Sequence, residues 1–156
     1  MTVSLDRIDK KILHVMQSDG RISNLELAEQ VGLSPTPCSR RVKRLEESGL
    51  IEKHVTLLNA KALGLGLTAM IGISMDRHTP DRFEQFEKAI KDMPEVLECS
   101  IVTGQSADFL LKVVVRDMSH YEEFLLGHLT NLKGVSGVHS SFVLRQVINK
   151  TELPLG

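Results

Sequence analysis

The sequence predicts an α+β protein with an N-terminal helix-turn-helix (winged-helix-like) module and a C-terminal ferredoxin-like βαββαβ module. Residues 5–49 carry apolar side chains at helical spacing, with helix start and stop signals between them. The rest of the chain alternates strand and helix patterns in the order β, α, β, β, α, β. The glycine-containing stretch ALGLGL separates the two patterns. We therefore expect modules at 1–59 and 67–156, joined by a linker at 60–66.

Two helices are predicted before the turn of the first module. The first helix is predicted by five apolar residues at helical spacing, Leu5, Ile8, Ile12, Val15 and Met16. Gly20 is expected to end it. The second opens with Ser23 and Glu26, a capping box in which each side chain satisfies a free backbone N–H group. Leu27, Ala28 and Val31 form its buried stripe.

A third helix is predicted to follow Gly32, which needs the left-handed backbone conformation after the second helix. Ser34 is the expected N-cap, Pro35 the first helical residue, and Gly49 the stop. Pro37 lies in the same first turn, where a missing N–H removes no hydrogen bond within the helix. Cys38, Val42 and Leu45 form the inward stripe.

The placement of charge matters more than the net charge of −1, which by itself does not indicate a nucleic-acid partner. Residues 34–45, SPTPCSRRVKRL, carry basic side chains and no acid. With the apolar stripe inward, Thr36, Arg40, Lys43 and Arg44 are expected on the outer face. A charged helix face is often simply solvated. The preceding capped helix and glycine turn favour instead a recognition helix that enters the major groove of DNA.

The segment after Gly49, IEKHVTLLN, has partial period-two alternation and predicts a short strand or wing. In the second module we expect strands at 67–75, 96–102, 109–115 and 138–147 and helices at 81–93 and 119–129. Helices on one face of such a sheet leave the other face partly apolar, so a dimer is predicted.

Catalytic and metal chemistry find no support in the motifs. The sequence has no P-loop, nucleophile elbow, zinc signature or paired carboxylates, so no catalytic residue and no metal site is expected. Cys38 and Cys99 lack spaced partners, and Cys38 is expected to pack in the core rather than to sense redox state. No apolar run is long enough for a membrane span and the N-terminus has no signal peptide, which favours a cytoplasmic protein. An alternative is that the second module is an enzyme or metabolite-binding module and the first contacts only proteins.

The segments LDRIDKKIL, GRISNLELAEQVGLSPTPCSRRVKRLEESGLI, VTGQSADFLLKVVV and KTELPLG carry a family resemblance. Over essentially its whole length the chain resembles the Lrp/AsnC (feast/famine) family of transcriptional regulators, of the leucine-responsive type. The resemblance implies a homodimer that assembles into a higher oligomer, commonly an octamer, and binds double-stranded DNA. It also implies an amino-acid effector such as leucine or methionine that modulates oligomeric state or DNA affinity, with no other cofactor.

Carried onto this chain, the resemblance also implies the site residues. The DNA contacts would be Ser34, Pro35, Thr36, Pro37, Arg40, Arg41, Lys43 and Arg44. The effector would bind Thr103, Gly104, Gln105, Ser106, Ala107 and Asp108, with Val138, His139 and Ser140 of a neighbouring dimer. Three residues separate Gly104 from Asp108 here, whereas the family usually has two, with an aromatic before the aspartate.

A physical reason supports an amino-acid site at this loop. A zwitterion needs an anion for its ammonium group and backbone or hydroxyl donors for its carboxylate. Asp108 beside Gly104 and Ser106 offers both. The alternative for Asp108 is a hydrogen bond to the backbone of its own turn, and His139 near the site is a possible further contact.

Overall fold

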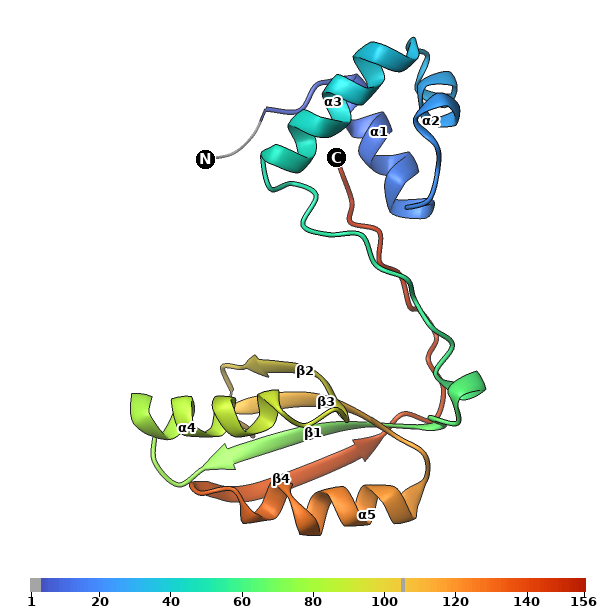
Figure 1. The fold of residues 1–156 in the computed structure, drawn as a ribbon. Coiled ribbons are helices and arrows are strands. Elements are labelled where there is room, and N and C mark those ends of the chain that lie inside the picture. Colours follow the sequence, from blue (N-terminus) through green and yellow to red (C-terminus); the bar gives the residue numbers. More distant parts are fainter. Residues whose placement is uncertain (1–3, 105) are drawn as a thin grey trace. The chain divides into compact units, whose positions relative to one another are not determined.

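A computed structural model describes residues 4–104 and 106–156, which form two compact units (Figure 1). Of the described residues, the first unit contains 4–57 together with 148–156, and the second contains those within 58–147. The change of unit near residue 57 lies just before the expected linker. The C-terminal nine residues, however, pack with the first unit and not with the second module to which the sequence assigned them.

Three helices build the first unit: α1 (Arg7–Ser18), α2 (Asn24–Val31) and α3 (Pro35–Glu47). The predicted capping box of α2 is present, with the Glu26 N–H donating to Ser23 Oγ at 3.2 Å and the Ser23 N–H donating to Glu26 Oε2 at 3.0 Å. The pattern predicted for the inward face is confirmed, because Cys38 and Leu45 are fully buried and Val42 packs against them.

The turn before α3 has the predicted geometry at Gly32, where φ is +76°. Ser34 occupies the N-cap position, but its side chain makes no capping hydrogen bond, and Pro35 supplies the first helical residue. The short strand predicted after Gly49 is wrong, since residues 51–59 adopt no β-strand. Partial alternation is a weak signal, and Val55 and Leu57 remain about two-thirds exposed with no partner strand in the described residues.

The second unit has the predicted βαββαβ order. Its elements are β1 (Leu67–Met75), α4 (Pro80–Lys91), β2 (Val96–Ile101), β3 (Phe109–Val115), α5 (Met118–Gly127) and β4 (Val135–Phe142), with single 3-10 turns at Lys61–Leu63 and Leu129–Asn131. The four strands pair antiparallel in the order β2-β3-β1-β4. The predicted fold class is therefore confirmed.

One face of this sheet packs against both helices. Ala69, Ile71 and Ile73 of β1 are fully buried there, in one cluster with Phe86 of α4 and Phe124 of α5. The last strand begins and ends earlier than predicted. It ends at Phe142, and Leu144, expected to continue the buried alternation, is fully exposed.

No helix of the described residues covers the opposite face of the sheet. This face bears Met70 and Gly72 of β1 with their cross-strand partners Lys112 and Leu110 of β3. Leu110 is 39% exposed, and Lys112 pairs with Glu98 at 3.0 Å. We call this surface the open face. Separately, none of the described helices is long and apolar enough to cross a membrane.

Candidate functional site

The third helix presents most of its predicted contact residues to solvent. Seven of the eight are exposed, namely Ser34, Pro35, Thr36, Pro37, Arg40, Lys43 and Arg44, whereas Arg41 is half-buried. The Asn24 side chain at the start of α2 donates to the Pro35 carbonyl oxygen at 2.9 Å. This bond joins the first turns of the two helices, so that the N-terminal half of α3 stands at the surface in a defined orientation.

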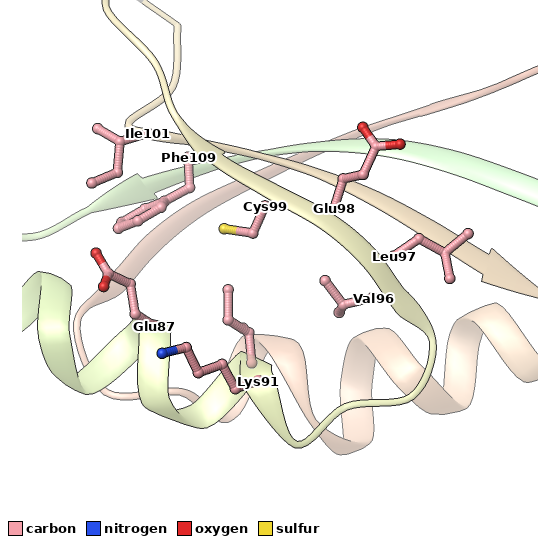
Figure 2. A pocket seen from close by; sticks show the side chains of 9 residues that line it. Glu87, Lys91, Val96, Leu97, Glu98, Cys99, Ile101 and Phe109 are labelled. Atoms are coloured by element: carbon pink, nitrogen blue, oxygen red, sulfur yellow. The ribbon is translucent and has the colours of Figure 1, made fainter. Parts of the chain in front are cut away.

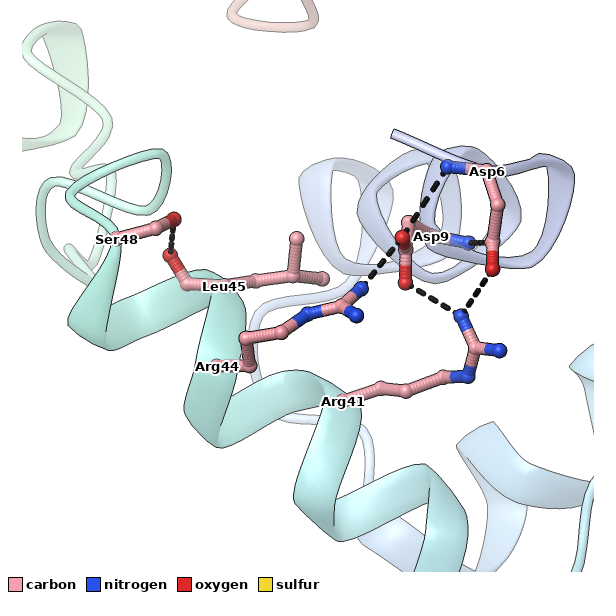
Figure 3. A network of polar contacts seen from close by, with 6 residues as sticks. All are labelled: Asp6, Asp9, Arg41, Arg44, Leu45 and Ser48. Atoms are coloured by element: carbon pink, nitrogen blue, oxygen red, sulfur yellow. Dashed lines mark hydrogen bonds and ion pairs between the residues drawn. The ribbon is translucent and has the colours of Figure 1, made fainter. Parts of the chain in front are cut away.

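Two of the predicted contact residues are engaged inside the unit (Figure 3). Arg41 Nη1 lies 2.6 Å from Asp6 Oδ2 and 2.8 Å from Asp9 Oδ1, and Arg44 Nη2 lies 2.5 Å from Asp9 Oδ2. Asp9 is 1% exposed. Arg44 is exposed as expected, with 54% of its side-chain surface accessible, but its guanidinium also pairs with Asp9.

These ion pairs attach α3 to α1. Asp6 caps α1, because the Asp9 N–H donates to its carboxylate at 2.8 Å. That backbone bond, with the Arg41 guanidinium beside it, lowers the pKa of Asp6 to about 2. The same carboxylates raise the pKa of Arg41. Residues 34–45 alone give no sign of this network, because its acids lie in α1; the sequence signal for it is the pair Asp6 and Asp9 at capping-box spacing.

Arg40 and Lys43 remain the basic groups of α3 that are available to an outside partner. Among the described residues Arg40 makes no ion pair, and Lys43 makes only an exposed pair with Glu47 at 3.7 Å on the same helix. An exposed pair of this kind contributes little and exchanges readily for a phosphate. Arg40 and Lys43 are both exposed to solvent on α3, and Arg40 lies one turn after the exposed Thr36.

In the second unit, the side chain of Asp108 is held by contacts with residues outside its own turn. Its Oδ2 accepts a hydrogen bond from the Met75 N–H at 2.7 Å, and its Oδ1 lies 2.9 Å from Nε2 of His78. Its own N–H donates to the Ile73 carbonyl oxygen at 2.8 Å. The carboxylate thus bonds to the chain at the end of β1 rather than to its own turn, and 21% of its side chain stays exposed.

The predicted residues of β4 do not share one face. Val138 and Ser140 pair with the buried Ile73 and Ile71, and the Ser140 hydroxyl bonds to the Tyr121 hydroxyl of α5. These two side chains therefore face the helix layer. His139 pairs with Gly72 and lies on the open face.

Gly72 is a residue that the sequence interpretation missed. A Cβ atom built on Gly72 would lie 3.2 Å from the Ala107 Cβ, so the loop before β3 closes tightly over this position. The available signal was a glycine inside a strand pattern, which often marks a close approach of another backbone or a ligand. Ala107 and His139 are thus both neighbours of Gly72. Thr103, Gly104 and Ser106 belong to the same loop, while the predicted Gln105 lies outside the described residues.

A separate hollow of about 550 Å³ lies between α4 and β2 (Figure 2). None of the predicted effector residues that the structure describes lines it. Its walls are Glu87, Ile90, Lys91, Val96, Leu97, Glu98, Cys99, Ile101 and Phe109.

Burial, and then the charge of Glu87, raise the pKa of Cys99, so its thiol stays protonated near neutral pH. Burial likewise raises the pKa of Cys38. No group of acids, histidines and cysteines suited to a metal ion occurs among the described residues.

Comparison with known families finds two matches that together span most of the chain. Residues 5–52 match a winged helix-turn-helix DNA-binding family, and residues 68–153 match the Lrp/AsnC ligand binding domain. The leucine-responsive regulatory protein of Escherichia coli is 45% identical over 149 residues, which is 96% of this chain and 90% of that protein.

Solved structures agree with these matches. A transcriptional regulator of Neisseria meningitidis in complex with L-methionine is 42% identical, with a TM-score of 0.94 and 97% of each chain covered. A feast or famine regulatory protein of M. tuberculosis, also in complex with L-methionine, is 26% identical with a TM-score of 0.85. It covers 96% of this chain and 99% of its own.

Proposed function

The chain belongs to the Lrp/AsnC family of DNA-binding transcription regulators, and we propose that it reads DNA with α3 and responds to an amino acid bound beside the loop 103–108. The observation that carries the DNA half is that α3 exposes the basic residues Arg40 and Lys43 while it is attached to α2 through Asn24 and to α1 through Asp9. A helix held this firmly reaches a groove without having to order itself on binding, which lowers the entropic cost of binding.

The predicted DNA contacts divide into two roles under this proposal. Ser34, Thr36, Arg40 and Lys43 contact the duplex directly. Pro35 and Pro37 shape the first turn, Arg41 holds the helix in place, and Arg44 does both, since half of its side chain is exposed. A protein that works on chromosomal DNA is expected in the cytoplasm.

Salt dependence of binding to a duplex selected from random sequence tests the DNA half. Each phosphate contact contributes a slope of about −0.9 to log affinity against log salt. Arg40→Ala is expected to reduce the slope by about one contact. Glu29→Ala, an exposed change on α2, is the matched control and leaves the slope unchanged. A chain whose retention on the duplex is unaffected by salt and by Arg40→Ala would contradict the proposal.

The ligand half rests on the chemistry around Gly72. Asp108 is a carboxylate with residual exposure, and the surrounding loop offers backbone donors and the Ser106 hydroxyl. These groups suit the ammonium and carboxylate of a free amino acid. Two solved relatives are complexes with L-methionine, which makes that amino acid the first to test. His139 is the β4 residue that we include, because Val138 and Ser140 face the helix layer.

Calorimetric titration with L-methionine and L-leucine tests the ligand half. Asp108→Asn keeps an oxygen that accepts from the Met75 N–H but removes the charge that binds ammonium, so affinity is expected to fall at least tenfold while the fold persists. Asp92→Asn, an exposed carboxylate at the end of α4, is the control. If Asp108→Asn binds as tightly as the unchanged chain, the ligand site lies elsewhere.

We further propose that two copies pair through the open face and that dimers assemble into a larger ring. The open face carries the exposed Leu110 without a covering helix. Leu110→Lys is expected to shift the mass measured by light scattering toward the monomer. Leu126→Lys on the outer side of α5, which is 57% exposed, is the matched control.

A further inference from the structure

The C-terminal residues 151–156 attach to α1 through three kinds of contact. The Gln17 side chain forms a two-way pair with the backbone of Leu153, its Nε2 donating to the carbonyl oxygen at 3.2 Å and its Oε1 accepting from the N–H at 2.6 Å. Lys10 Nζ donates to the Gly156 carbonyl oxygen at 2.8 Å. Leu155 is half-buried and packs against the core of the first unit. We call these residues the C-terminal clasp.

The C-terminal clasp binds to one side of α1. Lys10 and Gln17 are seven residues apart and therefore lie on the same side of the helix, two turns from each other. Leu155 packs against the core of the first unit and, with Lys10, Val15 and Val31, lines a hollow of about 490 Å³. Pro154 restricts Leu153 to an extended conformation, which lowers the entropy lost when the clasp attaches. The clasp is therefore a specific attachment and not a loose chain end.

The clasp gives the chain a second connection between its units. The chain passes from one unit to the other near residue 57 and again near residue 147. The second passage, residues 143–152, spans at most about 35 Å when extended. If the clasp were released, only the first passage would hold the recognition helix to the ligand-binding unit. The second passage also begins at the end of β4, the strand that carries His139.

We propose that the C-terminal clasp is a tether that presents the two recognition helices of a dimer to DNA as a pair, with Gln17 as its positioning residue. This proposal rests on the DNA-binding function proposed above. When two binding modules are linked, the second binds at an effective concentration set by the length and freedom of the link. Release of the clasp leaves only the first passage as the link, which gives the recognition helix more freedom without changing any group on α3 that contacts DNA.

The experiment compares two duplexes, one with two half-sites and one with a single half-site, both taken from the selected sequence. Gln17→Ala, and a full chain ended after Lys150, are expected to lose about tenfold in affinity for the two-site duplex and to keep their affinity for the single half-site. Leu153→Ala is the matched control, because its side chain is 71% exposed and only its backbone meets Gln17. It is expected to bind both duplexes like the unchanged chain.

Each other outcome overturns the proposal in a recognisable way. An equal loss on both duplexes means that the clasp only supports the fold of the first unit. No loss on either duplex means that the clasp does not limit the freedom of that unit. If the unchanged chain binds neither duplex, the DNA-binding function fails first, and the tether with it. Light scattering on every variant verifies that the oligomeric state is the same in all comparisons.

Discussion

The two units of this protein are held together by different means. In the second unit, the rings of Phe83, Phe86 and Phe109 stack with centroids 4.9 and 4.6 Å apart, and the buried residues are apolar or aromatic. The first unit buries smaller side chains and, among all described residues, the one fully buried charged group, Asp9. Packing of large side chains positions the sheet and its helices, whereas directional ion pairs position the recognition helix.

The difference follows from what each unit has to do. A small three-helix unit buries little apolar surface, so it has little packing with which to select one orientation of α3. A buried ion pair contributes little net stability, but it tolerates few alternative geometries. Asp9, with two arginines bound to it, thus gives the first unit a defined recognition surface rather than a more stable core.

The largest effect is expected from Phe109→Ala. Phe109 is fully buried between the two rings of α4, so its removal should destabilise the second unit by about 4 kcal/mol. Urea unfolding followed by Tyr121 fluorescence reports this unit specifically, because Tyr121 is the only tyrosine and the chain has no tryptophan. The first unit should keep its own transition in circular dichroism. A joint shift of both transitions would show that the two units unfold together.

The next largest effect is expected from Asp9→Ala, which leaves Arg41 and Arg44 without their shared acceptor. We expect a loss of about 3 kcal/mol in the first unit, at the lower end for breaking a buried pair because both arginines keep some exposure. The unfolding transition of the first unit, followed by circular dichroism, should shift to lower urea concentration. The transition of the second unit, followed by Tyr121 fluorescence, should stay where it is. DNA affinity should also fall. If an Asp9→Leu variant folds and binds DNA like the unchanged chain, the ion pairs of Asp9 are not what positions the recognition helix.

A smaller effect is expected from Gly72→Ala. The added Cβ would lie 3.2 Å from the Ala107 Cβ, so the loop before β3 has to yield by a few tenths of an ångström, at a cost of about 1 kcal/mol. L-methionine affinity should fall while DNA binding without ligand is retained. Gly127→Ala, where an added Cβ has nothing within 4 Å, is the control. Unchanged methionine affinity in Gly72→Ala would place the ligand away from this loop.

The smallest effect is expected in how the stability of the first unit depends on pH in the acidic range. Because the pKa of Asp6 is lowered to about 2 from 3.8, its contribution to stability is complete above pH 4 and is lost as pH falls through about 2. Asp6→Asn should therefore remove part of the acid sensitivity of the first unit and leave that of the second unchanged. Unfolding midpoints between pH 5 and 2 measure this. Identical pH profiles for the two proteins would contradict the prediction.

Several features of the site followed from neighbouring residues alone. The predicted cap at Ser23 involves a partner three residues away, and the left-handed turn at Gly32 needs only its own backbone freedom; the cap at Asp6 has the same spacing but was not predicted. The alternation in 67–75 and 109–115 predicted β1 and β3 to the residue. The last strand was placed too late, because Val135 to Gly137 has little apolar pattern and its place in the sheet comes from pairing with β1.

What the sequence by itself determined is the set of local structures and their order, because periodicity, capping and turn geometry act over a few residues. It also determined the family, through motifs spread over both modules. Only the tertiary structure decided which residues of those motifs are free to act. Arg41 and Arg44 meet an acid more than thirty positions away, Ser140 turns toward Tyr121, and the C-terminal clasp meets α1 across nearly the whole chain. Such contacts depend on how elements meet in space, which no local pattern encodes.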